Sequence, residues 1–436
     1  MNQQLNNHTT RLILLLLLFT GFMACEDAEK NQAQSETIFT ELDSLIQIKN
    51  YFAARDLFEQ HREDLTDYHR LRSGVFLDHA FNRPEASAAK TDSLLRFHAS
   101  EMTDSLRYQV EAITHITYSR LYEYQKAKES LEQVLSNHTK FLTPPEKENM
   151  ENTLIIWTAL EGQPKQKVSK QDDLEVPILR DIAGLQNLMV TQDTLQQQFV
   201  FDTGANISTI TESTATAFGV TLLDGTFEVA AITGQKMLSQ VGLLPRFSLG
   251  SIIVENAIFI VVPDEALAFP QIDYQIHGIL GFPVLEALDE IQITADDRFI
   301  VPREPGHATT GNLALDFLTP LLYLKDSRGS GTYILDTGAN NTMLFDTYYT
   351  LHQEELSAEK ETDYSFGGAG SFVTKKGVYV TFFPEINGKK IAMNSIIVLK
   401  QPLKEDNYFL GNIGQDFIQQ FDTMTLNFEQ MYLKME

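Results

Sequence analysis

The stretch Phe201-Asp202-Thr203-Gly204-Ala205-Asn206 decides the fold of this 436-residue chain, because its last five residues return as Asp336-Thr337-Gly338-Ala339-Asn340. Each copy follows an apolar run, Phe199 to Phe201 in the first and Tyr333 to Leu335 in the second. A strand is therefore expected to end at each Asp, and the Gly allows a tight turn after it. Two matching carboxylates on two matching turns indicate one site with two-fold symmetry.

Further landmarks follow each copy in the same order. A short helix is expected over residues 211–219 in the first half and 345–351 in the second. Each half then has a hairpin with glycine, whose candidate flap residues are Thr233, Gly234, Gln235, Gly367 and Gly368. An apolar pair and a glycine close each half, as Ile279-Leu280-Gly281 and Phe409-Leu410-Gly411. This order predicts an internal duplication, with lobe 1 over 176–303 and lobe 2 over 304–436.

Asp202 and Asp336 are the candidate catalytic residues. Two carboxylates a few ångström apart cannot both ionise, so the pair is expected to hold one proton between them. Such a pair can deprotonate water and can protonate both the carbonyl oxygen and the leaving nitrogen of an amide. The pattern therefore favours amide hydrolysis, and two carboxyl groups far apart in the structure would exclude it.

These residues resemble the active-site turns of retropepsin-like aspartic peptidases, and the resemblance spans roughly 176–436. It implies closed, barrel-like β lobes, a peptide or protein substrate, no cofactor and glycine hairpins that act as flaps. It also implies that Thr203, Gly204, Thr337 and Gly338 support the catalytic pair. Because both copies lie on one chain, a monomer is expected, and pairing of lobes between chains is the alternative.

Residues 38–160 show apolar side chains three and four positions apart, which predicts helices. Ala54, Ala89 and Ala127 are separated by intervals close to the period of about 34 residues that tetratricopeptide repeats have. A repeat array that binds a protein partner and an irregular helical bundle both remain open. The polar stretch 161–175 marks a domain boundary. The predicted fold is thus an all-α, tetratricopeptide-like domain followed by an all-β, two-lobed acid-protease barrel.

Residues 1–24 are expected to be a signal peptide, because Arg11 precedes an apolar run that is too short to span a bilayer. Cys25, the single cysteine, lies where a bacterial lipoprotein signal places the lipid-accepting thiol, and 25–37 is a polar tether. An exported protein anchored through Cys25 to a bacterial membrane, with the outer membrane favoured, is predicted. An ordinary secreted protein with an incidental cysteine is the alternative.

Composition narrows the function further. With 59 acidic and 34 basic side chains, the net charge of −25 argues against nucleic acid as a partner. The ten histidines show no metal-ligand spacing, and no G-x-S-x-G motif is present. The leading hypothesis is an exported aspartic endopeptidase. The alternative is a catalytically inactive peptide-binding or scaffold lipoprotein that keeps the protease fold.

Overall fold

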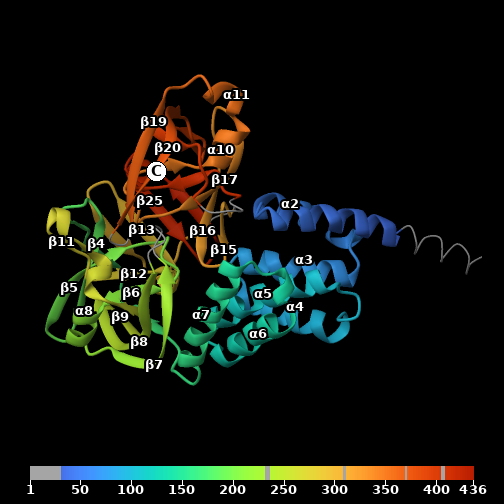
Figure 1. Ribbon diagram of the computed structural model, residues 1–436, viewed down its shortest axis with the longest axis horizontal. Coiled ribbons are helices and arrows are strands. Elements are labelled where there is room, and N and C mark those ends of the chain that lie inside the picture. Colours follow the sequence, from blue (N-terminus) through green and yellow to red (C-terminus); the bar gives the residue numbers. More distant parts are fainter. Residues whose placement is uncertain (1–30, 231–235, 308–310, 369–370, 404–407) are drawn as a thin grey trace, which may run out of the picture.

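The computed structural model describes residues 31–230, 236–307, 311–368, 371–403 and 408–436. Helices occupy 31–160, and a β-rich region with two lobes follows (Figure 1). In the figure, lobe 1 is green to yellow, lobe 2 is orange to red, and the helices lie along one side of both. The predicted order of a helical region and a two-lobed β region is confirmed.

The helices pair into hairpins over the described residues. A positive φ at Lys49, Asn82 and Tyr122 turns the chain, each time two residues before the second helix of a hairpin begins. A threonine caps the first turn of several helices, as Thr143 does with Glu146 in a capping box at α7. The elements are a helix over 31–47, α2 (Tyr51–His61), α3 (Asp67–Ala80), α4 (Pro84–Phe97), α5 (Asp104–Arg120), α6 (Tyr124–Asn137) and α7 (Pro144–Leu160).

Of the three alanines that suggested a repeat, Ala89 does not occupy the repeated position. Ala54 and Ala127 are fully buried at the fourth residue of α2 and α6. The fourth residue of α4 is Ser87, whose hydroxyl donates to the Val75 carbonyl oxygen at 2.8 Å, whereas Ala89 is exposed. The position that packs against the preceding helix is therefore filled by Ser87 in the middle hairpin.

The helical region also begins earlier than predicted. Residues 31–37, expected to be tether, are helical. Ser35 is buried there, its Oγ lies 2.7 Å from His69 Nδ1, and it accepts a hydrogen bond from the Thr66 N–H at 2.8 Å. The β-rich region likewise begins with β1 (Lys167–Ser169) inside the expected linker. Polar residues without apolar periodicity are ordered here by partners distant in the sequence.

Lobe 1 is a closed sheet. Strands β9, β6, β12, β5, β4 and β8 are hydrogen-bonded in this order, and β8 pairs back to β9. The parallel pair of β5 and β12 holds the strand that ends at Asp202 in the centre of the lobe. The elements are β3 (Leu179–Arg180), β4 (Gln186–Gln192), β5 (Leu195–Phe201), β6 (Ser208–Thr211), α8 (Glu212–Ala217), β7 (Thr221–Ala230), β8 (Lys236–Leu249), β9 (Ile252–Val262), β10 (Ala268–Phe269), β11 (Tyr274–Gln275), β12 (Gly278–Leu280) and α9 (Phe282–Glu286).

Lobe 2 repeats this order but is interrupted at Pro384, which has no N–H for the sheet. Strand β16 pairs with the short β21 after this proline, and β21 pairs with β22 at this end of the sheet. The elements are β15 (Leu313–Asp316), β16 (Thr319–Lys325), β17 (Ser330–Leu335), β18 (Met343–Leu344), α10 (Asp346–Leu351), α11 (Gln353–Leu356), β19 (Glu361–Gly368), β20 (Ser371–Phe382), β21 (Glu385–Ile386), β22 (Lys389–Lys390), β23 (Met393–Leu399), β24 (Gly411–Ile413) and α12 (Gln415–Ile418).

A sheet shared by both lobes fixes their relative position. Strand β13 of lobe 1 pairs antiparallel with β25 of lobe 2 along five residues. One hydrophobic core continues from lobe 1 to lobe 2, with Phe299 and Leu426 both fully buried in it. The strands, in sheet order, are β2 (Leu174–Pro177), β14 (Arg298–Val301), β13 (Glu290–Thr294), β25 (Thr423–Asn427) and β26 (Tyr432–Met435).

The helical region packs against both lobes. Arg120 of α5 forms an ion pair with Glu286 of lobe 1 at 2.6 Å, and Lys49 forms one with Asp316 of lobe 2 at 3.0 Å. Asn82 donates a hydrogen bond to the Phe428 carbonyl oxygen at 2.7 Å. Among the described residues, no helix is both long and apolar enough to cross a membrane.

Candidate active site

Each catalytic candidate follows the central strand of its lobe. Asp202 comes directly after β5, and its N–H donates to the Leu280 carbonyl oxygen on β12 at 3.1 Å. Asp336 comes directly after β17, and its N–H donates to Ile413 on β24 at 3.0 Å. The apolar residues before each Asp fill the core, so the first polar residue of the run emerges where the lobes meet. The predicted end of a strand at each Asp is confirmed.

The structure brings the two carboxyl groups together, where they hydrogen bond with each other. Asp202 Oδ1 also accepts from the Gly204 N–H at 2.7 Å, and Asp336 Oδ1 accepts from the Gly338 N–H at 2.9 Å. Both aspartates are partly accessible to solvent. One site is therefore formed from both halves of a single chain.

The glycine of each turn lies against the opposite carboxyl group. A Cβ on Gly204 would be 2.9 Å from Asp336 Cγ, and one on Gly338 would be 2.5 Å from Asp202 Oδ2. Neither carboxyl group can retreat, because each is held by the backbone of its own turn. Gly is thus required at both positions by the close approach of the two turns.

The threonines lock the turns to each other. The Thr203 N–H donates to Thr337 Oγ1 at 3.0 Å, and the Thr337 N–H donates to Thr203 Oγ1 at 3.1 Å. Each hydroxyl then donates across the lobes, Thr203 to the Leu335 carbonyl oxygen at 2.9 Å and Thr337 to the Phe201 carbonyl oxygen at 3.2 Å. Both side chains are fully buried, so these groups have no water as an alternative partner.

A second glycine braces each turn, and here one prediction is wrong. Gly281 donates its N–H to Ser208 Oγ at 3.0 Å in lobe 1, and Gly414 donates to Thr342 Oγ1 at 3.1 Å in lobe 2. The partner of Ile279-Leu280-Gly281 is therefore Asn412-Ile413-Gly414 and not Phe409-Leu410-Gly411. Asn412 and Ile413 pair with Ile334 and Leu335, the last two residues before Asp336, as Ile279 and Leu280 pair with Val200 and Phe201 before Asp202.

This shift in register reveals a residue that the search for an apolar pair missed. Asn412 and Ile279 occupy the same position on β24 and β12, each paired with the residue two before its Asp. Asn412 Nδ2 donates to Asp336 Oδ2 at 2.8 Å, whereas an isoleucine has no group to donate to Asp202. The distance along the chain from Asp to brace, 77 residues from Asp336 to Ile413 and 78 from Asp202 to Leu280, is the signal that identifies it.

The two carboxyl groups differ in their surroundings. Burial between the lobes and the nearby charge of Asp336 raise the pKa of Asp202 to about 8. Burial also raises the pKa of Asp336, but hydrogen bonds from Asn412 and Asp202 oppose this effect. The geometry therefore favours a proton on Asp202 and a negative charge on Asp336 near neutral pH.

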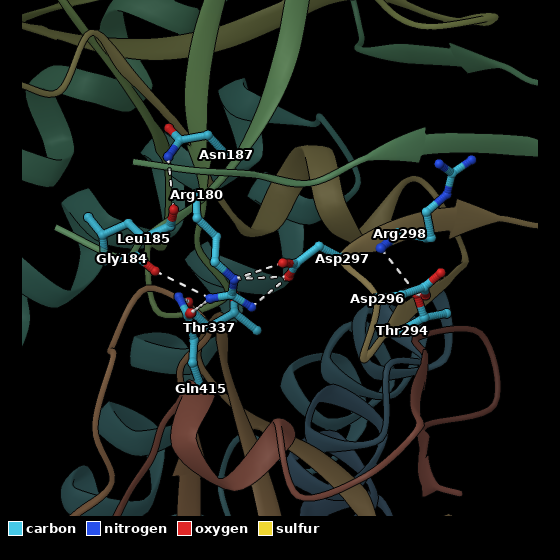
Figure 2. A network of polar contacts seen from close by, with 10 residues as sticks. All are labelled: Arg180, Gly184, Leu185, Asn187, Thr294, Asp296, Asp297, Arg298, Thr337 and Gln415. Carbon is cyan, nitrogen blue, oxygen red and sulfur yellow. Dashed lines mark hydrogen bonds and ion pairs between the residues drawn. The ribbon is translucent and has the colours of Figure 1, made fainter. Parts of the chain in front are cut away.

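A polar network between the lobes supports the second turn (Figure 2). Arg180 of β3 donates to Gln415 Oε1 at 2.9 Å, and Gln415 Nε2 donates to the Thr337 carbonyl oxygen at 2.9 Å. Asp297 binds the other side of the same guanidinium at 2.7 Å. In lobe 1 the residue after the bracing glycine is Phe282, which is fully buried. No local sequence pattern indicates this network, since Arg180 and Gln415 are 235 residues apart.

Each lobe has a hairpin in the region where the sequence predicts a flap. Strands β7 and β8 form the first, and the predicted flap residues Thr233, Gly234 and Gln235 lie outside the described residues. Strands β19 and β20 form the second, with Gly367 and Gly368 at the end of β19. Met237 of β8 packs against the hydrophobic cluster that contains Val200, while Tyr364 and Phe366 of β19 pack against the cluster that Ile334 also contacts. Each hairpin thus adds apolar side chains beside the strand that carries its Asp.

Other predicted site residues can be placed briefly. No group of three or more His, Cys, Asp or Glu side chains with metal-binding geometry occurs in the part of the chain that the structure describes. Cys25, the predicted lipidation site, lies outside that part.

Comparison with known proteins found a family match within lobe 1. A family model for aspartyl proteases matches residues 188–284, which include the first turn and its bracing glycine. No curated protein matches the chain. Among solved structures, the chain is similar to basic 7S globulin from soybean, with 11% identity and a TM-score of 0.39, over 61% of this chain and 94% of that chain. The family match places an aspartyl protease-like region at residues 188–284 of the β-rich part.

Proposed function

We propose that this protein is an aspartic endopeptidase in which Asp202 and Asp336 activate water. The observation that carries the proposal is the pair of hydrogen-bonded carboxyl groups on two turns with matching backbone contacts. A β-turn that served only the fold would need neither the close approach of the glycines nor the second carboxyl group. The family match over 188–284 supports the same assignment.

The proposed reaction uses the single proton of the pair. The ionised carboxylate takes a proton from water while the water oxygen bonds to the carbonyl carbon, and the protonated carboxyl gives its proton to the carbonyl oxygen. The tetrahedral intermediate then collapses. Its C–N bond breaks as one hydroxyl group of the intermediate returns a proton to the ionised carboxylate and the protonated carboxyl group protonates the leaving nitrogen. The products are a carboxylic acid and an amine. The pair ends with one proton, as it began.

The substrate class follows from the surroundings of the pair. Two apolar clusters flank the aspartates, one with Val200 and Met237 and the other with Ile334 and Phe366. These clusters support a peptide substrate with apolar side chains on both sides of the cleaved bond. Because one chain supplies both aspartates, we propose a monomeric enzyme.

We further propose that the enzyme is exported and held at a bacterial membrane by lipid on Cys25. This proposal rests on the sequence of residues 1–25. Growth of cells that express the full chain with labelled palmitate would test it. Label is expected in the wild type and absent from Cys25→Ser, and an unlabelled wild type would favour the ordinary secreted form.

The helical region is proposed to be a tetratricopeptide-like array. Its support is the recurring positive-φ turn at Lys49, Asn82 and Tyr122, together with buried small residues at matching positions. Since these turns pack on the β lobes, we propose that the array positions the catalytic lobes, and that a protein partner would bind its opposite face.

A peptide library at mildly acidic pH tests the proposed function. The wild type is expected to cleave library peptides between apolar residues. Asp202→Asn is expected to be inactive and still to show a cooperative thermal unfolding transition, which indicates that it is folded. Equal turnover by both proteins would contradict the assignment. A wild type that cleaves nothing would favour the inactive, peptide-binding alternative.

A further inference from the structure

Asn412 makes the proposed active site asymmetric. Its Nδ2 lies 2.8 Å from Asp336 Oδ2, and its partly buried position on β24 corresponds to that of Ile279 on β12. The backbone contacts of the two turns agree closely, from the strand pairing to the glycine N–H groups. The side chain at this one position is therefore the nearest difference between the two carboxyl groups.

The contacts of Asn412 show that it serves Asp336. Its other amide atom, Oδ1, is buried and has no hydrogen-bond partner among the described residues. A buried acceptor without a partner costs stability, and lobe 1 fills the same position with an apolar side chain. A residue retained for packing alone would not need the amide group.

We propose that Asn412 is a positioning residue that keeps Asp336 as the ionised, water-activating member of the pair and leaves the shared proton on Asp202. The names of these roles rest on the proposed peptidase function, whereas the location of the proton does not. An N–H that points at Asp336 Oδ2 stabilises a negative charge there, and Asp202 then carries the proton that the scissile carbonyl oxygen receives.

Other charged groups near Asp336 do not produce the same effect. Asp202 faces it from lobe 1. On α12, the carboxyl group of Asp416 is occupied by the N–H and hydroxyl of Thr342. Arg180 reaches this turn only through Gln415, which contacts the Thr337 backbone. Burial raises the pKa of both aspartates, and at Asp336 the hydrogen bond from Asn412 opposes this rise, in the direction that the geometry indicates.

Exchange of the two equivalent residues tests the proposal. Asn412→Ile gives both carboxyl groups the same apolar neighbour, and Asn412→Leu is a second variant of similar size should the first fail to fold. Ile279→Asn is the matched change in lobe 1. The double variant with Ile279→Asn and Asn412→Ile reverses the asymmetry. All four are made in the full chain, and thermal unfolding confirms that each is folded.

Carboxyl ¹³C NMR titration locates the proton, with signals assigned through Asp202→Asn and Asp336→Asn. In the wild type near neutral pH, the Asp336 signal is expected at the chemical shift of an ionised carboxylate and the Asp202 signal at that of a protonated carboxyl group. The signals should converge in Asn412→Ile and exchange their behaviour in the double variant. If Asn412 served only the packing of the fold, its replacement would leave the proton on Asp202. An unchanged location of the proton in Asn412→Ile and Asn412→Leu would therefore overturn the proposal.

Kinetics separate this inference from the proposed function. The acidic limb of the pH profile of kcat/KM is expected to move upward by about one pH unit in Asn412→Ile. If no protein cleaves peptides but the carboxyl signals exchange, the peptidase function fails and the role of Asn412 stands. If the wild type cleaves peptides but Asn412→Ile shifts neither the acidic limb of the pH profile nor the carboxyl signals, the proposed role of Asn412 is wrong and the peptidase function stands.

Discussion

Lobe 1 and lobe 2 carry their aspartates on turns with matching hydrogen bonds, but the side chains around those turns differ. Asn412 on β24 donates to Asp336, and the corresponding position on β12 of lobe 1 is occupied by Ile279. The hairpin of lobe 1 is also attached to the helical region, where Ile155 of α7 packs over Gly225. Figure 1 places β19 and β20 of lobe 2 at the end of the molecule away from α7.

The comparison of the two lobes distinguishes the features of the site that occur in both lobes from those that occur in one. The carboxyl group, the glycine and the threonine occur in both lobes, because each contacts its counterpart across the junction. The side-chain amide that donates to a carboxyl group, that of Asn412, has an apolar counterpart in lobe 1, as a shared proton has a single location at any moment. The support for a hairpin also differs between the lobes. Helix α7 packs against β7 and β8 of lobe 1, whereas β19 and β20 of lobe 2 lie at the end of the molecule away from α7.

The largest expected effect is the loss of either aspartate. Asp202→Asn and Asp336→Asn should each lower kcat/KM by about 10²- to 10⁴-fold, because one carboxyl group cannot act as both base and acid. Steady-state kinetics on a peptide identified from the library measures this. If one of the two variants keeps wild-type turnover, that lobe supplies only the scaffold, and the two-fold site is refuted.

The next effect concerns the glycines that face the opposite carboxyl group. Gly204→Ala and Gly338→Ala should each destabilise the fold by about 1–3 kcal/mol and reduce turnover, because a Cβ forces the turns apart. Denaturant unfolding provides the measurement. Gly329→Ala is the matched control, as a Cβ there meets no atom within 4 Å. Equal stability of all three variants would show that the turns are not in close contact.

The threonines should destabilise the fold equally in the two lobes. Thr203→Val and Thr337→Val each leave a buried N–H and a buried carbonyl oxygen without a partner. A cost of about 1–3 kcal/mol for each orphaned group is expected, measured by urea unfolding. A cost confined to one variant would mean that the reciprocal contact is absent in solution.

The smallest effect tests the attachment of the lobe 1 hairpin. The Glu228 N–H on β7 donates to Asn152 Oδ1 of α7 at 3.3 Å, so Asn152→Ala should speed amide hydrogen exchange in β7 several-fold. Its stability cost is expected to be about 0.5–1.5 kcal/mol. The β19 amides serve as the internal control. Faster exchange in both hairpins would indicate a general loss of stability, and no change in β7 would show that α7 does not hold it.

The features of the site that depend on local sequence could be predicted. Each Asp at the end of an apolar strand, the short helices α8 and α10 and the hairpins follow from patterns within a few residues. Asn412 was missed because a polar side chain stands where an apolar pair was sought, and an apolar pair occurs three residues earlier.

Contacts between distant segments account for the remaining differences. The helix over residues 31–47 depends on Ser35 meeting His69 and Thr66, and nothing in the polar sequence 31–37 shows this. The break in lobe 2 at Pro384 follows from a missing N–H, but the sequence does not reveal which strand would need that donor. The link from Arg180 to the second turn likewise exists only once the lobes have come together.

The pH dependence of stability tests the shared proton most directly, because it requires no substrate. The folded pair keeps a proton with a pKa of about 8, while an unfolded Asp loses its proton near pH 3.9. The stabilisation is therefore fully present below about pH 4 and is lost as the pH rises towards 8. Relative to Asp202→Asn, the free energy of unfolding of the wild type should fall by up to about 1.4 kcal/mol per pH unit in this window. A difference between the two proteins that stays constant from pH 4 to 8 would contradict a shared proton.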